Sequence, residues 1–309
     1  MKALASFILR GQSQAMLVVV GFAVLSLALP PLSILSGAAV ALVTLRHGMQ
    51  AGVVLMAGAT LVVGLLAAFS LGNPAPALMF LTALWLPLWM LGSLLRASRS
   101  LSLTLMLAGG LGLLGVLVVY LLLDDVAGWW HGILLQIFNP VMGEAGLADQ
   151  DVILAALESV SRVMTGMMAV GMVLNAVICL FLARGWQAQL FNPGGFREEF
   201  QQLRMGRSLS GITVLLVLLY VLQMGAISSM AADMLIVLLS LYMLQGLALA
   251  HAVVAMKQLH IAWLIGLYVV AFVVLPQLML AVAAVGLLDT WVDLRRRVAG
   301  PGAGGAGEE

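Results

Sequence analysis

Two short motifs in this sequence hold acidic residues of the kind that do chemistry, and neither has the complete spacing. The stretch EEFQQLR, which starts at Glu198, resembles the EExxxR element of glutamic intramembrane proteases but has one residue too many. On a helix that extra residue turns Arg204 by about 100° away from the glutamates. The Asp124 and Asp125 pair lacks the third carboxylate of a DDxxD motif, and hard cations need more oxygen ligands than this. We therefore expect neither proteolysis nor magnesium binding.

A glycine motif, GLGLLG at residues 110–115, has the letters of a dinucleotide-binding fingerprint but not its surroundings. The fingerprint works where a strand turns into a helix that holds a pyrophosphate, whereas these glycines lie inside an apolar stretch. Ala108 and Gly112 instead favour close packing between helices. The chain has no HExxH or GxSxG motif, and its one cysteine, Cys179, has no disulfide partner. We expect no catalytic residues, no cofactor and no metal, and hence no enzyme.

The composition predicts a protein embedded in the lipid bilayer. Of its 309 residues, 63% are hydrophobic and 9% are charged, whereas soluble domains have about 25% charged residues. Stretches of roughly 20 apolar residues, which are long enough to cross the hydrocarbon layer, follow one another along the chain. The net charge of +1 and the scattered basic residues provide no basic face for nucleic acid. The lipid bilayer is thus the first expected partner, and homo-oligomerisation stays open.

The apolar stretches predict an all-α, polytopic helical membrane protein with about eight to ten transmembrane helices. Pro30 and Pro31 divide the first stretch, residues 15–45, and because proline breaks helices we expect two short tilted helices there. Pro276 is expected to break the last stretch, residues 261–288, in the same way. The spans between these two stretches are expected at residues 49–71, 77–95, 101–123, 164–182, 209–227 and 234–256.

The charges of the connecting segments predict which side each faces. Arginines gather at residues 96–99 and 184–207, whereas residues 124–158 hold six acidic residues and no lysine or arginine. Because arginine and lysine stay on the cytoplasmic side, both termini and the arginine-rich connectors are predicted to be cytoplasmic. The acidic segment is then extracytoplasmic, and its tryptophans and leucines at helical spacing predict an interfacial helix. Both termini inside require an even number of crossings, although a plain count of stretches gives nine.

These features predict a single integral membrane domain over residues 1–298. Its two main excursions are the acidic segment at 124–158 and a cytoplasmic loop with an amphipathic helix at 184–208. The last residues, 299–309, are rich in glycine and are expected to form a disordered tail.

Four polar residues within or beside the predicted spans are candidates to line a substrate cavity. Polar groups in lipid usually face a partner helix or a cavity, so two interpretations stand side by side. In one, these side chains contact a substrate, and in the other they form hydrogen bonds between helices. The four residues are Asn175, Gln223, Gln245 and His251.

The densest polar stretch, residues 191–208, predicts a turn followed by a short amphipathic helix. Phe196, Phe200 and Leu203 recur at helical spacing and form one apolar face, which is expected on the cytoplasmic membrane surface. The C-terminal stretch GLLDTWVDLRRR offers complementary charges, so we expect the two to dock, with Glu198 and Glu199 near the arginines at residues 295–297, for example Glu199 near Arg296. Two independently solvated helices are the alternative. The candidate docking residues are Asn192, Pro193, Gly194, Gly195, Glu198, Glu199, Arg204, Arg207, Asp289, Asp293 and Arg295.

These two polar stretches, together with the early LPPLSILSGAAVALVTLRHG, resemble the bacterial family of YybS-like proteins, the domain of unknown function numbered 2232. The resemblance covers nearly the whole chain and implies a multi-pass protein of the bacterial inner membrane. The family is itself distantly similar to the substrate-binding membrane components of energy-coupling-factor vitamin transporters and to the cell-shape protein MreD. The resemblance therefore implies a membrane protein without specifying a reaction.

Two functions fit these observations. The first is a transport-type protein, substrate-binding or permease-like, in which helices broken at the prolines frame a small-molecule cavity. With no nucleotide-binding motif, active transport would need an ion gradient or a partner ATPase. The second is a non-transporting scaffold or assembly factor that recruits a cytoplasmic or membrane protein through residues 191–208. A transporter needs its polar residues to line a cavity, whereas a scaffold can bury them in helix contacts.

Overall fold

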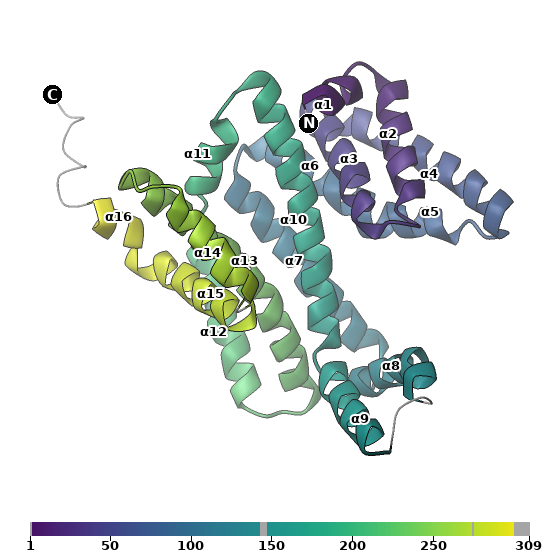
Figure 1. Cartoon of the computed structure of the whole chain (residues 1–309), viewed down its shortest axis with the longest axis vertical. Helices are drawn as coiled ribbons and strands as arrows, with labels where there is room; N and C mark the ends of the chain where they lie inside the picture. Colours follow the sequence, from purple (N-terminus) through teal and green to yellow (C-terminus); the bar gives the residue numbers. More distant parts are fainter. Residues whose placement is uncertain (1, 143–146, 274, 300–309) are drawn as a thin grey trace.

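The computed structural model describes residues 2–142, 147–273 and 275–299, and this part of the chain is helical and contains no strand (Figure 1). The first half comprises α1 (Lys2–Ile8), α2 (Gln12–Leu25), η1 (Pro30–Leu32), α3 (Ser33–His47), α4 (Met49–Leu71), α5 (Ala75–Met79), η2 (Phe80–Trp85), α6 (Leu86–Ser98) and α7 (Leu101–Leu122). The second half comprises α8 (Val126–Met142), α9 (Leu147–Ser161), α10 (Met164–Phe191), α11 (Gly195–Gln201), α12 (Arg207–Val221), α13 (Ala226–Met256), α14 (Ala262–Val273), α15 (Leu275–Val292) and α16 (Leu294–Ala299). The predicted all-α class is confirmed.

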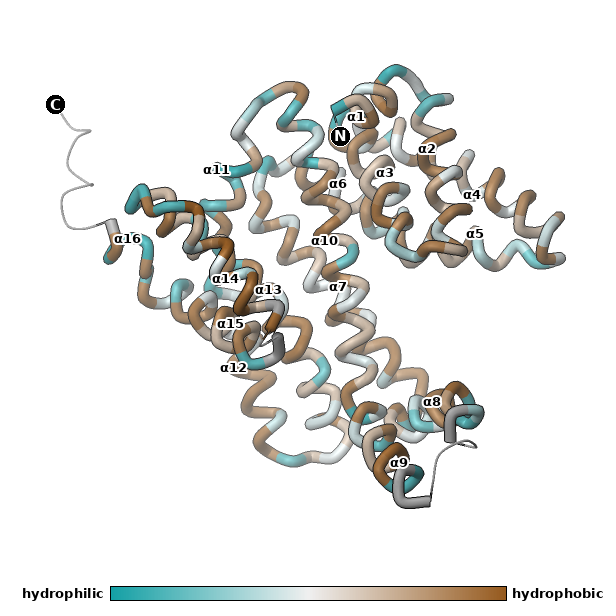
Figure 2. Tube along the Cα trace, in the orientation of Figure 1, coloured by the Kyte–Doolittle hydropathy of each residue, from teal (hydrophilic) through white to brown (hydrophobic). Residues whose placement is uncertain are grey.

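Several of these helices are long and apolar enough to cross a membrane. Within the described ranges five qualify singly: α4, the continuous run α5–η2–α6, α7, α10 and α13. The bent pair α1 and α2 would add a sixth, and α12, α14 and α15 are shorter apolar helices. Figure 2 shows hydrophobic residues along the long helices, with hydrophilic ones gathered in connections and around α11 and α16. The polytopic architecture is confirmed, and eight to ten crossings stay a prediction.

Both proline positions separate helices as expected. Pro30 and Pro31 form the short 3-10 turn η1 between α2 and α3. Trp85 Nε1 donates to Ser36 Oγ at 3.1 Å, and Ser36 Oγ donates to the Val19 carbonyl oxygen at 2.8 Å, which ties α2, α3 and η2 together. In the last stretch α14 ends at Val273 and α15 begins at Leu275, which places Pro276 in the first turn of α15. Proline is tolerated there because first-turn N–H groups have no partner within the helix.

One span departs from a regular α-helix. Between α5 and α6 the chain widens into the π-helical segment η2, in which the Leu86 N–H bonds to the carbonyl of Leu81, five residues earlier. Pro87 follows directly and has no N–H to donate to the carbonyl four residues before it. A wide turn next to a proline and close to a cavity is typical of functional positions in helices.

Close helix contacts depend on glycine. Gly246 of α13 and Gly286 of α15 meet where these two helices cross. A Cβ at Gly286 would lie 2.0 Å from the Tyr242 carbonyl oxygen, and one at Gly246 would lie 2.1 Å from the Val282 carbonyl oxygen. At Gly112 of α7, a Cβ would lie 2.6 Å from a methyl group of Val173. Within the GLGLLG motif, Gly112 therefore serves close packing, as predicted, whereas a Cβ at Gly110 or Gly115 would meet no atom within 4 Å.

The segment expected at the outer surface is indeed helical. It forms α8, which packs against α9. Trp130 of α8 donates a hydrogen bond from Nε1 to Thr165 Oγ1 of α10 at 2.8 Å. At the other end of the chain α16 extends to Ala299. The predicted disordered tail therefore starts at least one residue too early, and the rest of it, residues 300–309, lies outside the described part.

Candidate functional site

The polar stretch at residues 191–208 forms the predicted turn and short helix. α10 ends at Phe191, Gly194 has a φ of +93° that suits glycine, and α11 follows. The apolar face of α11 packs against protein. Phe196 and Phe200 lie 5.4 and 5.6 Å from Phe181 of α10 between ring centroids, and Leu203 is buried. These side chains therefore pack partly on α10 and α13, and the expected position of the helix at the cytoplasmic membrane surface stays a prediction.

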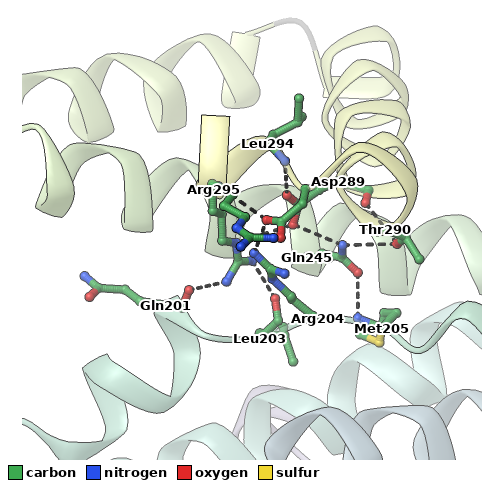
Figure 3. A network of polar contacts seen from close by, with 12 residues as sticks. Gln201, Leu203, Arg204, Met205, Gln245, Asp289, Thr290, Leu294 and Arg295 are labelled. Atoms are coloured by element: carbon green, nitrogen blue, oxygen red, sulfur yellow. Dashed lines mark hydrogen bonds and ion pairs between the residues drawn. The ribbon is translucent and has the colours of Figure 1, made fainter. Parts of the chain in front are cut away.

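A buried polar network joins this stretch to the C-terminal helices (Figure 3). Arg295 of α16 is 8% exposed and donates to two backbone carbonyl oxygens, those of Gln201 and of Leu203, the latter at 2.6 Å. Its Nε lies 3.4 Å from Oδ2 of Asp289, which is 2% exposed. Asp289 Oδ1 in turn accepts the Leu294 N–H at 3.0 Å. Here a buried cation and a buried anion compensate each other.

Gln245 of α13 completes this network from a third segment. Its Oε1 accepts the Met205 N–H at 2.7 Å, and its Nε2 lies 3.3 Å from Asp289 Oδ2 and 3.2 Å from Thr290 Oγ1. The side chain is fully buried, so each of its polar atoms needs a partner, and each has one. Gln245 thus bonds the 201–205 connection to α15 instead of lining a cavity.

Two further ion pairs surround the network, and they correct the predicted partners. Arg204 pairs with Asp293, at the start of the C-terminal arginine run. Glu199, expected near Arg295, pairs instead with Arg184 of α10, whose Nε donates to Glu199 Oε2 at 2.9 Å while its Nη2 binds the other carboxylate oxygen. Glu198 is exposed, and we find no ion pair for it in the described ranges. The docking of the two stretches was predicted, but its pairs were not.

The electrostatics of the network follow from these contacts. The hydrogen bond from Arg204 lowers the pKa of Asp293 below its ordinary value, because it stabilises the carboxylate. Burial lowers the pKa of Arg295, and the nearby Asp289 opposes that shift. A guanidinium keeps its proton at any pH of interest, so the cluster holds two cations and two anions in contact.

The other predicted cavity residues lie apart from one another. His251 sits between the rings of Phe200 and Tyr268, and its Nδ1 is 2.9 Å from the Leu247 carbonyl oxygen. Asn175 is half-buried on α10. Gln223 is exposed in the connection between α12 and α13, with a φ of +53°. The structure therefore does not gather the four residues around one space. In the docking set, Asn192, Pro193 and Arg207 are exposed, and Gly195 is buried.

Two apolar cavities lie elsewhere, and none of those four residues lines them. One of about 960 Å³ lies between α13, α14 and α15. The other, of about 400 Å³, lies between η2, α6, α7 and α10 under Trp130 of α8. Its polar side chains are few, chiefly Thr82, Trp130 and Thr165.

The sequence did not indicate the roles of two charged residues, Arg184 and Asp233. Arg184 is fifteen residues from its partner Glu199, which is not a helical spacing, so only the turn at 192–195 brings them together. Asp233 was not among the candidate residues, and the predicted span began one residue later, at residue 234. α13 in fact begins at Ala226, and Asp233 is buried in its second turn.

The long apolar helices, packed through glycines and held by buried polar contacts, define an integral helical membrane protein. The chain belongs to the family described as predicted membrane protein, DUF2232, whose model matches residues 15–290. This confirms the resemblance inferred from the polar stretches. Comparisons with curated proteins and with solved structures gave no match. The similarity to energy-coupling-factor components and to MreD therefore stays a prediction.

Proposed function

We propose that this protein is of the transport type and binds a small apolar or amphipathic molecule within the bilayer. The observation that carries the proposal is the cavity of about 400 Å³ between η2, α6, α7 and α10. Small-molecule sites typically occupy about 300–1,000 Å³ and are mostly apolar with a few polar groups. This cavity has both properties, and its wall contains the only π-helical segment in the described ranges.

The lining of the cavity favours an apolar ligand. Thr82 Oγ1 already donates to the Leu78 carbonyl oxygen of its own helix, and Thr165 Oγ1 accepts from Trp130. Few hydrogen-bonding groups remain free, so shape and apolar contact would select the ligand. Trp130 of α8 lines the cavity and is held to Thr165 by a single side-chain hydrogen bond, so a movement of α8 would change the cavity wall. A site of this kind suits the hydrocarbon part of a lipid-soluble molecule better than a polar metabolite.

The test fills the cavity without disturbing its walls. Gly115 lines it, and a Cβ there would meet no atom within 4 Å. Gly115→Leu should remove the small molecules that purified protein retains in detergent, measured by mass spectrometry, and leave thermal stability unchanged. Gly110→Leu is the matched control, because Gly110 lies on the same helix, has equal space and does not line the cavity. Equal retention by both variants, or none by the wild type, would refute the proposal.

The alternative function, a membrane scaffold, is favoured by one specific observation. Gln245 is buried in contacts between three segments, as expected if its role is to hold the α11 region in place. The exposed side of that region carries Arg197, Glu198 and Arg207. A protein that co-purifies with the wild type, and is lost in an Arg197→Glu/Arg207→Glu variant, would favour the scaffold. A second copy of the chain retained in the same way would indicate a homo-oligomer.

A further inference from the structure

Asp233 is a buried acid for which the described residues provide no cationic partner. It lies in the second turn of α13 and is 1% exposed. Its Oδ2 accepts the Tyr120 hydroxyl of α7 at 2.8 Å, and its Oδ1 makes no well-aligned hydrogen bond in the described part of the chain, although the backbone of Gly166 in α10 lies directly against it. Gln245, which belongs to the buried Arg295 network, is twelve positions further along the same helix, or about 18 Å away by helical rise. Asp233 is therefore isolated from the arginine cluster.

The surroundings of Asp233 are tight and contain few charges. The first turn of α10 packs on it through Gly166, where a Cβ would lie 2.7 Å from Oδ1 and 2.9 Å from the Asp233 Cα. α7 contributes Tyr120. α10 contributes the partial positive charge of its N-terminus and no charged side chain in this turn. The charged residue of α12, Arg207, begins that helix at the opposite end.

The charged side chains on the side of Tyr120 line a polar cavity next to Asp233. Tyr120 lines this cavity, of about 410 Å³, together with Asp124, Asp125 and Arg162. Arg162 pairs with Glu158, one helical turn earlier, and both are exposed. Tyr120 therefore contacts the polar cavity and also donates to Asp233. It connects the buried acid to the surface at the α8 end of the molecule.

We propose that Asp233 is a proton-binding site, reached from this cavity through Tyr120. An ionised carboxylate in an apolar interior is unfavourable unless a cation compensates it, and a buried acid without one takes up a proton instead. The geometry is compatible with the neutral acid: Oδ2 accepts from Tyr120 in either protonation state, and Oδ1 is the oxygen on which the proton would reside. One carboxyl and one phenol are too few oxygen ligands for a metal cation, which makes the proton the fitting ligand.

The site has a route by which proton binding would affect the proposed small-molecule cavity, and this second step rests on the proposed function. Tyr120 directly follows Val119, and Gly166 directly follows Thr165; both Val119 and Thr165 line the cavity of about 400 Å³. Loss of the proton would place a full negative charge against the first turn of α10, whose N-terminal partial positive charge would attract it more strongly than the neutral acid. The contact between α7, α10 and α13 would then repack, and the cavity wall would move with it.

Infrared difference spectroscopy between acid and alkaline pH tests the proton site directly. The purified wild type in lipid vesicles should show the carbonyl band of one buried protonated carboxyl group, and Asp233→Asn should lose it. Tyr120→Phe should keep the band at a shifted frequency. Asp289→Asn is the matched control, because Asp289 is also buried but is paired with Arg295, and it should leave the band unchanged. Should either aspartate variant fail to fold, the wild-type band and its Tyr120→Phe shift still decide.

Four outcomes separate the proposals. If the wild type has no such band, Asp233 is ionised and acts only as a structural cap on α10, which overturns the inference. A band that persists in folded Asp233→Asn overturns it as well. If the band is present and retention of small molecules does not differ between acid and alkaline pH, the proton site stands and its link to the cavity fails. A wild type that retains no small molecules refutes the proposed function alone.

Discussion

Asp233 and Asp289 are both buried aspartates, the first on α13 and the second on α15 in contact with α13. They differ in whether a cation lies beside the carboxyl group. Asp289 has the guanidinium of Arg295 at 3.4 Å and accepts a backbone N–H as well. Asp233 has a tyrosine hydroxyl and the Gly166 backbone beside it, and no cation in the described part of the chain. At the α11 end of the molecule the buried charge is compensated within the fold, whereas at the α8 end it is not. A compensated pair holds segments together, and an uncompensated acid is free to respond to pH.

The difference also shows in what each region connects. The Arg295 network joins three stretches that are distant in sequence, at 201–205, at Gln245 and at 289–295, through backbone carbonyls as well as side chains. Asp233 touches α7 and the first turn of α10 by one hydrogen bond and one close contact. We therefore expect the Arg295 network to contribute more to the stability of the fold, and the surroundings of Asp233 to contribute more to its response to pH.

The largest effect is expected from Arg295→Met. This change leaves Asp289 as a buried charge without a partner and two carbonyls without their donor, so it should lower the free energy of unfolding by about 3–5 kcal/mol. Thermal unfolding in detergent measures it. Arg296→Met, at the exposed neighbouring position, is the control. Adding Asp289→Asn to Arg295→Met should restore part of the loss. Equal stability of the Arg295 and Arg296 variants would contradict the compensated pair.

A smaller effect is expected from Gly166→Ala at the other region. The added methyl would lie 2.9 Å from the Asp233 Cα and 3.0 Å from its carbonyl oxygen, so α10 must move away. Overpacking of this kind costs about 1–3 kcal/mol. Gly171→Ala on the same helix is the control, because its Cβ would have no neighbour within 4 Å. If both alanine variants unfold alike, the close contact between α10 and α13 is not tight.

The Arg184–Glu199 pair should show a measurable coupling of about 1 kcal/mol. Both side chains are partly buried and make two contacts, which distinguishes them from an exposed surface pair. A double-mutant cycle with Arg184→Gln and Glu199→Gln, followed by thermal unfolding, gives the coupling. The same cycle with Glu199 and Arg296, the pairing suggested by sequence, should give none. Coupling to Arg296 that exceeds coupling to Arg184 would contradict the structure.

The smallest effect is a dependence of stability on acid pH from Asp293. Its pKa is lowered by the hydrogen bond from Arg204, so the pair stabilises the folded state at pH values above the ordinary aspartate pKa of about 3.9. That contribution is lost as the pH falls through the lowered pKa. Unfolding measured across this range should be less steep in Arg204→Gln than in the wild type. An identical slope in the two proteins would show that the exposed pair contributes nothing.

Much of the fold was predictable because it depends on local pattern. Met49–Leu71 was expected as a span and is α4, and the helix breaks at Pro30 and Pro276 follow from the missing proline N–H. The π-helical turn of η2 was not predicted, because a one-residue widening leaves the apolar composition unchanged. The start of α13 was placed at residue 234 because the polar and small residues before it read as a connection.

The candidate site was predictable only in outline. That the 191–208 stretch meets the C-terminal arginines followed from complementary charge, but the partner of each charge did not. Glu199 meets Arg184 because the turn at Gly194 folds α11 back on α10. Gln245 was a candidate both for a substrate cavity and for hydrogen bonds between helices, and sequence does not distinguish these two uses of a polar residue in a span.

The sequence by itself determined that this is a helical membrane protein of its family, because composition, proline and charge act through the solvent and the local backbone. Tertiary structure alone decided which buried acid is paired and which is not. Asp289 and Asp233 are the same residue type in apolar helices, and only the approach of α16 to one and of α7 and α10 to the other sets their partners. Compensation of charge acts over a few ångströms, and such distances between remote segments exist only once the helices have packed.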